Sequence, residues 1–308
     1  MQHLIVTIKG FFVGIALIIP GLSGGTLAVY LGIYEKLLHA IGHVFSEFVD
    51  SMKFLIPLFV GMAISIVGLA NLLGYLIDVN SFVILLFFMG LIAGGIKDIY
   101  QAARQDETDI KPSSIITGVI SFALILLLIV FGKLSNSTGI STIDISVWNI
   151  VLLFFLGMAA SMTMIVPGVS GSALLIVLGY YTAIVTNVVG EILDFSQFSY
   201  NIQVIIPFAL GAAIGIILFS KVIESALKRF TQQTYFAILG FVGGSIIAIF
   251  FEIKDPSTGM THDLQDPIYN NLISFLGDNI ISLLGAIVLF VLGFVVLRRL
   301  TQMDFKSN

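Results

Sequence analysis

Long apolar stretches separated by short polar segments run along almost the whole chain, and none alternates apolar and polar residues as a half-buried strand would. Most of these stretches are close to the roughly 20 residues with which a helix spans a bilayer. Two are about twice that length and are interrupted in the middle, so each can enter a membrane, turn and leave on the same side. The predicted elements are hairpins at 4–45 and 147–190, and single helices at 54–77, 82–100, 115–134, 204–222, 235–251 and 279–299.

The two interrupted stretches share one sequence pattern. The first reads ALIIPGLSGGTLAVYLGIY (16–34) and the second TMIVPGVSGSALLIVLGYY (163–181), so that Pro-Gly, Ser-Gly and Leu-Gly recur in register. Two downstream stretches repeat in the same order, IPLFVGMA (56–63) with IPFALGAA (206–213) and MGLIAGG (89–95) with LGFVGGS (239–245). The chain is therefore predicted to consist of two related halves, 1–134 and 147–303, joined by the polar loop 135–146.

Each half contains one hairpin and three crossings, and because three is odd the second half starts on the opposite side of the membrane. We therefore predict an all-α polytopic membrane protein of two inverted repeats, each a re-entrant broken-helix hairpin followed by three transmembrane helices. With the N-terminus in the cytoplasm, 12 of the 14 Lys and Arg residues lie on the cytoplasmic side, as the distribution of positive charge in membrane proteins requires. Both termini are then cytoplasmic. The alternative to each hairpin is a pair of unequal crossings with polar ends. Inverted repeats with broken helices are typical of secondary transporters, whose binding sites lie near the bilayer midplane.

Composition agrees with a multi-pass protein of the cell membrane. Hydrophobic residues make up 58% of the chain and charged residues 10%, whereas soluble domains carry about 25% charged residues. A net charge of −4 gives no reason to expect a nucleic-acid partner. Since there is no cysteine, disulfides, thiolate metal sites and cysteine nucleophiles are excluded.

The two breaks carry the candidate chemistry. After each break a helix restarts, its first amides lack intrahelical partners, and its dipole end is partly positive. Ser23 and Ser170 occupy predicted N-cap positions, with hydroxyls in the following turn and glycines that allow close approach. Two opposed helix N-termini of this kind predict an anion site, with phosphate as the natural ligand. The predicted substrate-binding residues are Pro20, Gly21, Ser23, Gly24, Gly25, Thr26, Pro167, Gly168, Ser170, Gly171 and Ser172.

A structural alternative is that proline, glycine and small residues merely kink and pack the membrane helices. The duplication of the break in both halves favours a binding site over this alternative.

On PGLSGGTLAVYLGIYEKL and PGVSGSALLIVLGYY the chain resembles the bacterial and archaeal polyprenyl-phosphate (undecaprenyl-phosphate) translocase family of the PopT type. The resemblance covers nearly the whole chain. It implies that the protein returns undecaprenyl phosphate, a carrier lipid of envelope assembly, to the inner leaflet. It also implies that the polyprenyl-phosphate lipid is the ligand of the two motifs. The halves would rock to expose the phosphate alternately, while the tail stays among the membrane lipids.

Other polar residues suggest weaker hypotheses. Glu35 follows the first broken helix and could carry a coupling proton; otherwise it belongs to an interfacial pair with Lys36. Glu35, His39, His43 and Glu47 recur every fourth residue, a stripe that could ligate a metal but better fits the wet face of a helix. We therefore expect no bound metal and no cofactor, with proton or sodium coupling left open.

Three other functions compete with lipid translocation. An ion-coupled transporter of a small soluble anion would use the same hairpins. A phosphatase or intramembrane protease lacks its basic residues near the breaks, so we expect no enzyme. A channel would need a continuous polar pore, which few intramembrane polar residues could line. The sequence indicates neither the coupling ion nor an oligomeric state.

Overall fold

The computed structural model describes residues 2–19, 22–104, 109–134, 140–189, 197–253 and 280–302, and helices are the regular secondary structure that these residues form. The helices are α1 (Gln2–Ile18), α2 (Gly24–Tyr30), α3 (Tyr34–Gly42), α4 (Phe48–Ala103), α5 (Pro112–Leu134), α6 (Val147–Ile165), α7 (Gly171–Val177), the π-helix η1 (Thr182–Val189), α8 (Phe198–Arg229), α9 (Thr231–Phe250) and α12 (Ile280–Gln302).

Six of the described helices are long and apolar enough to cross a membrane: α4, α5, α6, α8, α9 and α12. The protein is thus an all-helical, multi-pass membrane protein, as predicted. Two details differ from the sequence prediction. α6 alone has the length of a span although it was predicted as half of a hairpin, and α8 extends for 32 residues because a polar, charged end continues the apolar helix.

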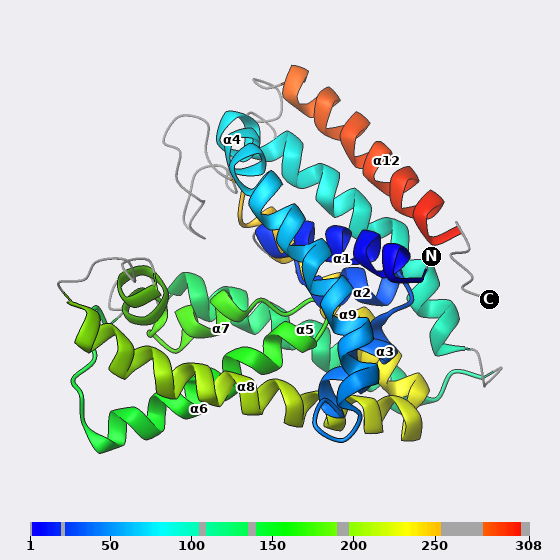
Figure 1. Cartoon of the computed structure of the whole chain (residues 1–308). Coiled ribbons are helices and arrows are strands. Elements are labelled where there is room, and N and C mark those ends of the chain that lie inside the picture. The colour runs from blue at the N-terminus through cyan, green and yellow to red at the C-terminus, as the bar shows by residue number, and fades with distance from the viewer. Residues whose placement is uncertain are drawn as a thin grey trace.

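The helix α4 contains both predicted spans 54–77 and 82–100 as two legs (Figure 1). The legs join at Asn80, whose backbone is not helical (φ −159°, ψ 85°). The Asn80 carboxamide oxygen accepts a bond from the Val83 amide at 3.1 Å and so caps the second leg. Its amide nitrogen donates to the Ser282 hydroxyl of α12 at 3.1 Å, which fixes the turn against the last helix.

Helix crossings in the two parts of the chain are built alike. In the first, α1 meets the first leg of α4 at Gly10 and Gly61, and a Cβ on either glycine would overlap a backbone carbonyl of the other helix. In the second, α6 meets α8 at Gly157 and Gly211 with the same reciprocal contact. Small residues let membrane helices approach this closely, which maximises their dispersion contact.

One turn further along, each crossing places a serine opposite a glycine. Ser65 of α4 lies against Gly14 of α1, and Ser161 of α6 lies against Gly215 of α8. Both serine hydroxyls donate to the carbonyl three residues earlier in their own helix, at 2.9 and 2.8 Å. The two crossings share this geometry, but the serine lies on the later helix, α4, in the first crossing and on the earlier helix, α6, in the second.

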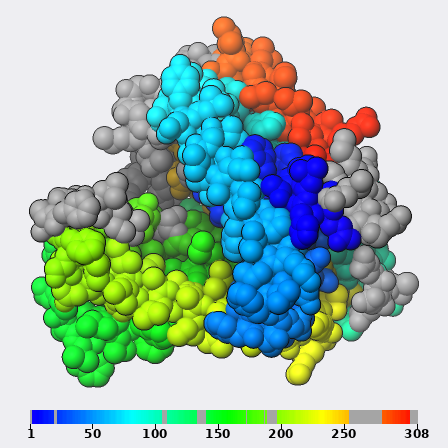
Figure 2. Space-filling view, in the orientation of Figure 1, coloured from blue at the N-terminus to red at the C-terminus, as the bar shows by residue number. Residues whose placement is uncertain are grey.

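The remaining long helices pair across the two halves. The second leg of α4 packs along α12, with Gly90 against the Phe290 carbonyl, and α5 packs along α9, with Gly240 against the Gly118 carbonyl. In Figure 1, α4 and α12 form one group with α1, while α6 and α8 form another. The groups meet where α3 contacts α8 and spread apart from there; the blue atoms of α3 and the start of α4 rest on the yellow end of α8 in Figure 2.

Candidate functional site

The helix breaks lie where the sequence predicts them. α1 ends at Ile18 and α2 begins at Gly24, while α6 ends at Ile165 and α7 begins at Gly171. Ser23 and Ser170 hold the N-cap positions with extended backbones, φ −99° and −94°. The predicted N-cap positions are confirmed, although neither side chain forms a capping hydrogen bond with its own helix.

The two breaks meet in space although 143 residues separate the serine of the first from Val166 of the second. The Ser23 hydroxyl lies 3.5 Å from the Val166 carbonyl oxygen. The Tyr34 hydroxyl donates to the Ile165 carbonyl at 3.0 Å, which satisfies an acceptor at the open end of α6. A Cβ on Gly25 would lie 2.9 Å from that same carbonyl oxygen. The meeting of the tips explains why Ser23 does not cap α2, because its hydroxyl reaches the other break instead.

Buried hydroxyls lie at the first tip. The side chain of Ser23 is 6% exposed and that of Thr26 is fully buried. Thr26 Oγ1 has no hydrogen-bond partner among the described residues, an arrangement that costs free energy unless a ligand supplies one. On the second tip, Pro167 and Gly168 are buried, whereas Ser170 and Gly171 are partly exposed.

The glycines of the tips contact protein. A Cβ on Gly24 would lie 3.0 Å from Leu17, and one on Gly171 would lie 2.9 Å from the Thr163 hydroxyl. Gly168 adopts a positive φ of 83° with its backbone against Phe241. These glycines therefore permit the close packing of the breaks, and their contact with substrate stays a prediction. Pro20, Gly21 and the side chain of Ser172 lie outside the described residues.

Both short helices after the breaks end in the same motif. Gly32 and Gly179 have φ values of 64° and 78°, the left-handed region that favours glycine. The following amides, of Ile33 and Tyr180, reach back to carbonyls five residues earlier at 3.0 and 2.9 Å, which closes each helix in a Schellman-type turn. The chain then continues into α3 in one case and into the π-helix η1 in the other.

Three side chains hold the first tip and were not singled out from the sequence. Tyr30 donates to the Ile92 carbonyl of α4 at 2.7 Å, and Tyr34 bridges to α6 as described. The Lys9 ammonium donates to the Leu31 carbonyl at 2.8 Å and places a positive charge at the C-terminal end of α2. The sequence offers little indication of these three roles, because each side chain donates to a backbone carbonyl, and a backbone carbonyl is present at every residue.

Glu35, the predicted coupling residue, lies at the surface between α3 and α9. Its carboxylate accepts a hydrogen bond from the Tyr235 hydroxyl at 2.8 Å. Lys36 lies with its ammonium 5.1 Å from the centre of the Phe54 ring, so it stacks on α4. A coupling role for Glu35 stays a prediction.

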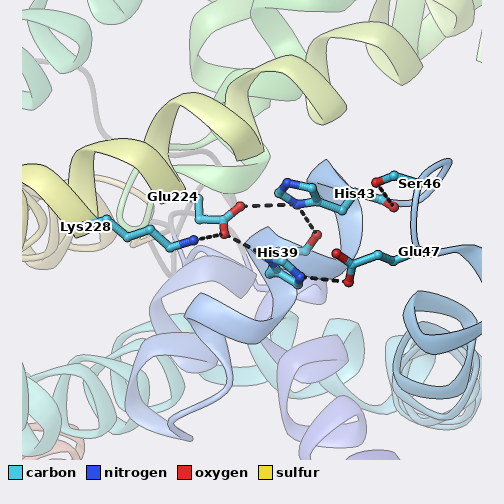
Figure 3. A network of polar contacts seen from close by, with 6 residues as sticks. All are labelled: His39, His43, Ser46, Glu47, Glu224 and Lys228. Atoms are coloured by element: carbon cyan, nitrogen blue, oxygen red, sulfur yellow. Dashed lines mark hydrogen bonds and ion pairs between the residues drawn. The ribbon is translucent and has the colours of Figure 1, made fainter.

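A network of polar side chains joins α3 to α8 (Figure 3). Glu224 of α8 accepts from His39 at 2.9 Å and from Lys228 at 2.6 Å, and His39 also reaches Glu47 at 3.1 Å. Hydrogen bonds to Glu224 and then to Glu47 raise the pKa of His39. Glu224 thus turns toward α3 and is held by both His39 and Lys228.

A cavity of about 500 Å³ lies between the second leg of α4, α9 and α12, and no residue of the breaks lines it. Lys97, Tyr100 and Arg298 line it with apolar neighbours. Arg298 is paired with Asp98 at 3.1 Å, so one of the two cations at this cavity is already neutralised.

These features define a multi-pass helical membrane protein whose two broken helices meet inside the bundle. The sequence of residues 13–263 matches the undecaprenyl phosphate translocase-like family, and the chain belongs to that family. This confirms the resemblance seen in the motifs.

Two relatives carry the name polyprenyl-phosphate transporter. The chain is 29% identical to the protein of Staphylococcus aureus over 245 residues, which cover 79% of this chain and 84% of the relative. It is 28% identical to the protein of Vibrio cholerae over 260 residues, which cover 80% of this chain and 77% of the relative. No solved structure matches the chain.

Proposed function

We propose that this protein moves polyprenyl phosphate across the cytoplasmic membrane, returning the undecaprenyl carrier lipid to the inner leaflet. The observation that carries the proposal is the contact between the two breaks, Ser23 Oγ to Val166 O at 3.5 Å, in a chain of this family. A phosphate cannot cross hydrocarbon unaided, because an unpaired charge there is very costly. The protein has only to shelter the headgroup, while the polyprenyl tail remains in lipid. The names of the relatives support transport and not catalysis.

The phosphate is held where the two tips meet. The first amides of α2 and α7, which have no intrahelical carbonyl partners, would face it together with the hydroxyls of Ser23, Thr26 and Ser170. The unpartnered Thr26 hydroxyl supports this assignment, because a bound phosphate oxygen would accept its hydrogen bond. The halves rock against each other to open the site alternately to the two leaflets.

Contacts between helix ends support the inverted topology. Ends predicted in the cytoplasm lie together, as Gln232 Nε2 donates to the Asp109 carbonyl at 2.9 Å and Arg298 pairs with Asp98. Ends predicted outside also lie together, as Asn80 contacts Ser282 and the Tyr200 hydroxyl accepts from the Ile143 amide at 2.8 Å. The repeated crossings of α1 with α4 and α6 with α8 add to this support.

Reconstitution in liposomes tests the proposal directly. Movement of polyprenyl phosphate between leaflets is measured with and without imposed proton and sodium gradients, and we expect it to require the protein. Uptake of inorganic phosphate into the liposomes without any movement of the lipid would instead indicate a transporter of a small soluble anion.

A double variant tests the site itself. We expect Ser23→Ala with Ser170→Ala to reduce lipid movement by about tenfold or more, since a hydrogen bond to a charged group contributes about 1.5–3 kcal/mol. The matched control is Ser65→Ala with Ser161→Ala, which removes one buried hydroxyl from each part at the helix crossings, opposite Gly14 and Gly215. Equal transport by both double variants would refute the assignment of the phosphate to the tips.

A further inference from the structure

The α3–α8 contact brings together donor atoms that suit a transition metal. His39 and His43 lie one turn apart on the side of α3 that faces α8, with their rings stacked at 4.4 Å between centroids. Glu224 of α8 directs one carboxylate oxygen to each ring, at 2.9 Å to His39 Nδ1 and 3.5 Å to His43 Nδ1 (Figure 3). His43 Nδ1 also lies 3.1 Å from the His39 carbonyl oxygen, a contact that a bound metal would replace. One donor atom from each of the three residues lies within 4.8 Å of the others.

These donors match the requirements of zinc. In a tetrahedral site the metal–nitrogen distance is about 2.0–2.1 Å, which places ligand atoms roughly 3.3 Å apart. The two nitrogen–oxygen distances at Glu224 already bracket that value, so rotations of side chains would complete the set. Two histidines and one carboxylate are a donor set that Zn²⁺ uses, with a water in the fourth position. We propose that His39, His43 and Glu224 bind one divalent transition-metal ion, Zn²⁺ by donor chemistry, which bridges α3 and α8.

A second carboxylate, that of Glu47, lies where it would hold the His39 ring in position for a metal. Glu47 Oε2 lies 3.1 Å from His39 Nε2, on the side of the ring away from Glu224. Histidine ligands of metals commonly donate their other ring N–H to a carboxylate, which holds the ring and raises its basicity. Glu47 therefore acts as the positioning residue for His39, while Glu224 closes the metal set from the other helix.

Charge and burial favour a cation at Glu224. The Glu224 side chain is only 9% exposed and is paired at present with Lys228 at 2.6 Å. The Lys228 side chain is 70% exposed and carries its ammonium on a flexible four-carbon chain, so it can leave the carboxylate when a divalent ion arrives. With neutral histidines the two carboxylates outweigh the one lysine, and the cluster carries a net negative charge before the metal binds.

Metal binding by the full chain tests this inference without reference to any transported substrate. The protein is purified with a histidine-free affinity tag, Zn²⁺ binding is measured by calorimetry, and Co²⁺ serves as the spectroscopic probe. We expect one Zn²⁺ per chain and the strong visible absorption of four-coordinate Co²⁺. His39→Ala, His43→Ala and Glu224→Gln should each weaken Zn²⁺ binding by about tenfold or more, since loss of even an outer partner costs about 10–100-fold.

Control variants separate a built site from casual histidine binding. His3→Ala removes an exposed histidine outside the cluster and should leave Zn²⁺ affinity unchanged. Lys228→Gln removes the competing cation and should tighten binding. A rise in the unfolding temperature on adding Zn²⁺ is expected for the native chain and absent for the His39→Ala, His43→Ala double variant. Binding that survives Glu224→Gln or that falls equally in His3→Ala would overturn the proposal.

Discussion

Thr26 is a residue of the first tip whose buried hydroxyl is not explained by protein contacts alone. Its hydroxyl is fully buried without a partner among the described residues. Replacing Thr26 by valine keeps the shape and removes the oxygen, so the free energy of unfolding should rise by about 1 kcal/mol because an unsatisfied buried group costs about 1–3 kcal/mol. Lipid transport should nevertheless fall about tenfold, as the phosphate loses a donor. Thermal unfolding in detergent and the liposome assay measure the two effects.

The control for Thr26 is Thr117→Val, in which the lost hydroxyl does have a partner. Thr117 donates to the Ser114 carbonyl at 2.8 Å, so this variant should lose stability and keep its transport rate. A Thr26→Val protein that is more stable and transports normally would show that the buried hydroxyl does not meet the substrate.

Tyr34 and Tyr30 make similar bonds with different consequences. Tyr34 ties the first tip to α6 in the second half, whereas Tyr30 ties it to α4 in its own half. Phenylalanine at either position should lower the free energy of unfolding by about 1 kcal/mol, the usual net contribution of such a bond. Only Tyr34→Phe should change the transport rate, because the proposed rocking of the halves would break that bond and not the other. Equal transport rates in the two variants would argue against rocking at this contact.

At the scale of the element, the crossing of α1 with α4 depends on the lack of a side chain at Gly61. A Cβ there would overlap the Thr7 carbonyl of α1, so Gly61→Ala should lower the free energy of unfolding by about 3 kcal/mol or more. Gly211→Ala should do the same at the crossing of α8 with α6. Gly68→Ala is the control, because nothing lies within 4 Å of its Cβ position and alanine favours the helix by up to about 1 kcal/mol. Size-exclusion profiles of the variants after heating rank them, and a folded Gly61→Ala protein as stable as Gly68→Ala would contradict this account.

The elements were predictable where a strong local signal exists. Pro-Gly and Ser-Gly located both breaks, and the stretches 235–251 and 279–299 fall on α9 and α12 because apolar runs define a membrane helix. Hydropathy could not predict the full length of α8, because the helix continues past its apolar stretch into a polar C-terminal end that packs against α3. Nor could it find that the N-cap serine at 23 would bond to the other break, because the competing acceptor comes from residue 166.

At the scale of the whole molecule, long-range partners were the part that the sequence could not supply. The stripe of His39, His43 and Glu47 was visible from its spacing, but Glu224 lies 185 residues from His39 and only the folded α3–α8 contact unites them. The convergence of the two tips was expected from the repeat alone. The tyrosine bonds that hold it were not, because backbone acceptors leave no trace in the sequence.

The proposed inverted topology makes a prediction about the entire chain, and the lack of cysteine makes that prediction easy to test. Single cysteines at the exposed positions His3 and Lys53 flank the first hairpin, and those at Thr142 and Ser199 flank the second. Since a re-entrant hairpin returns to its starting side, a membrane-impermeant maleimide added to intact cells should label Thr142→Cys and Ser199→Cys and leave the other two unlabelled until the membrane is opened. If the first segment crossed the membrane only once, His3 and Lys53 would lie on opposite faces. The distribution of positive charge, which places both positions in the cytoplasm, would then have given the wrong topology. Labelling of one member of either pair without the other therefore rejects the paired hairpins, and with them the entry of the two tips from opposite leaflets.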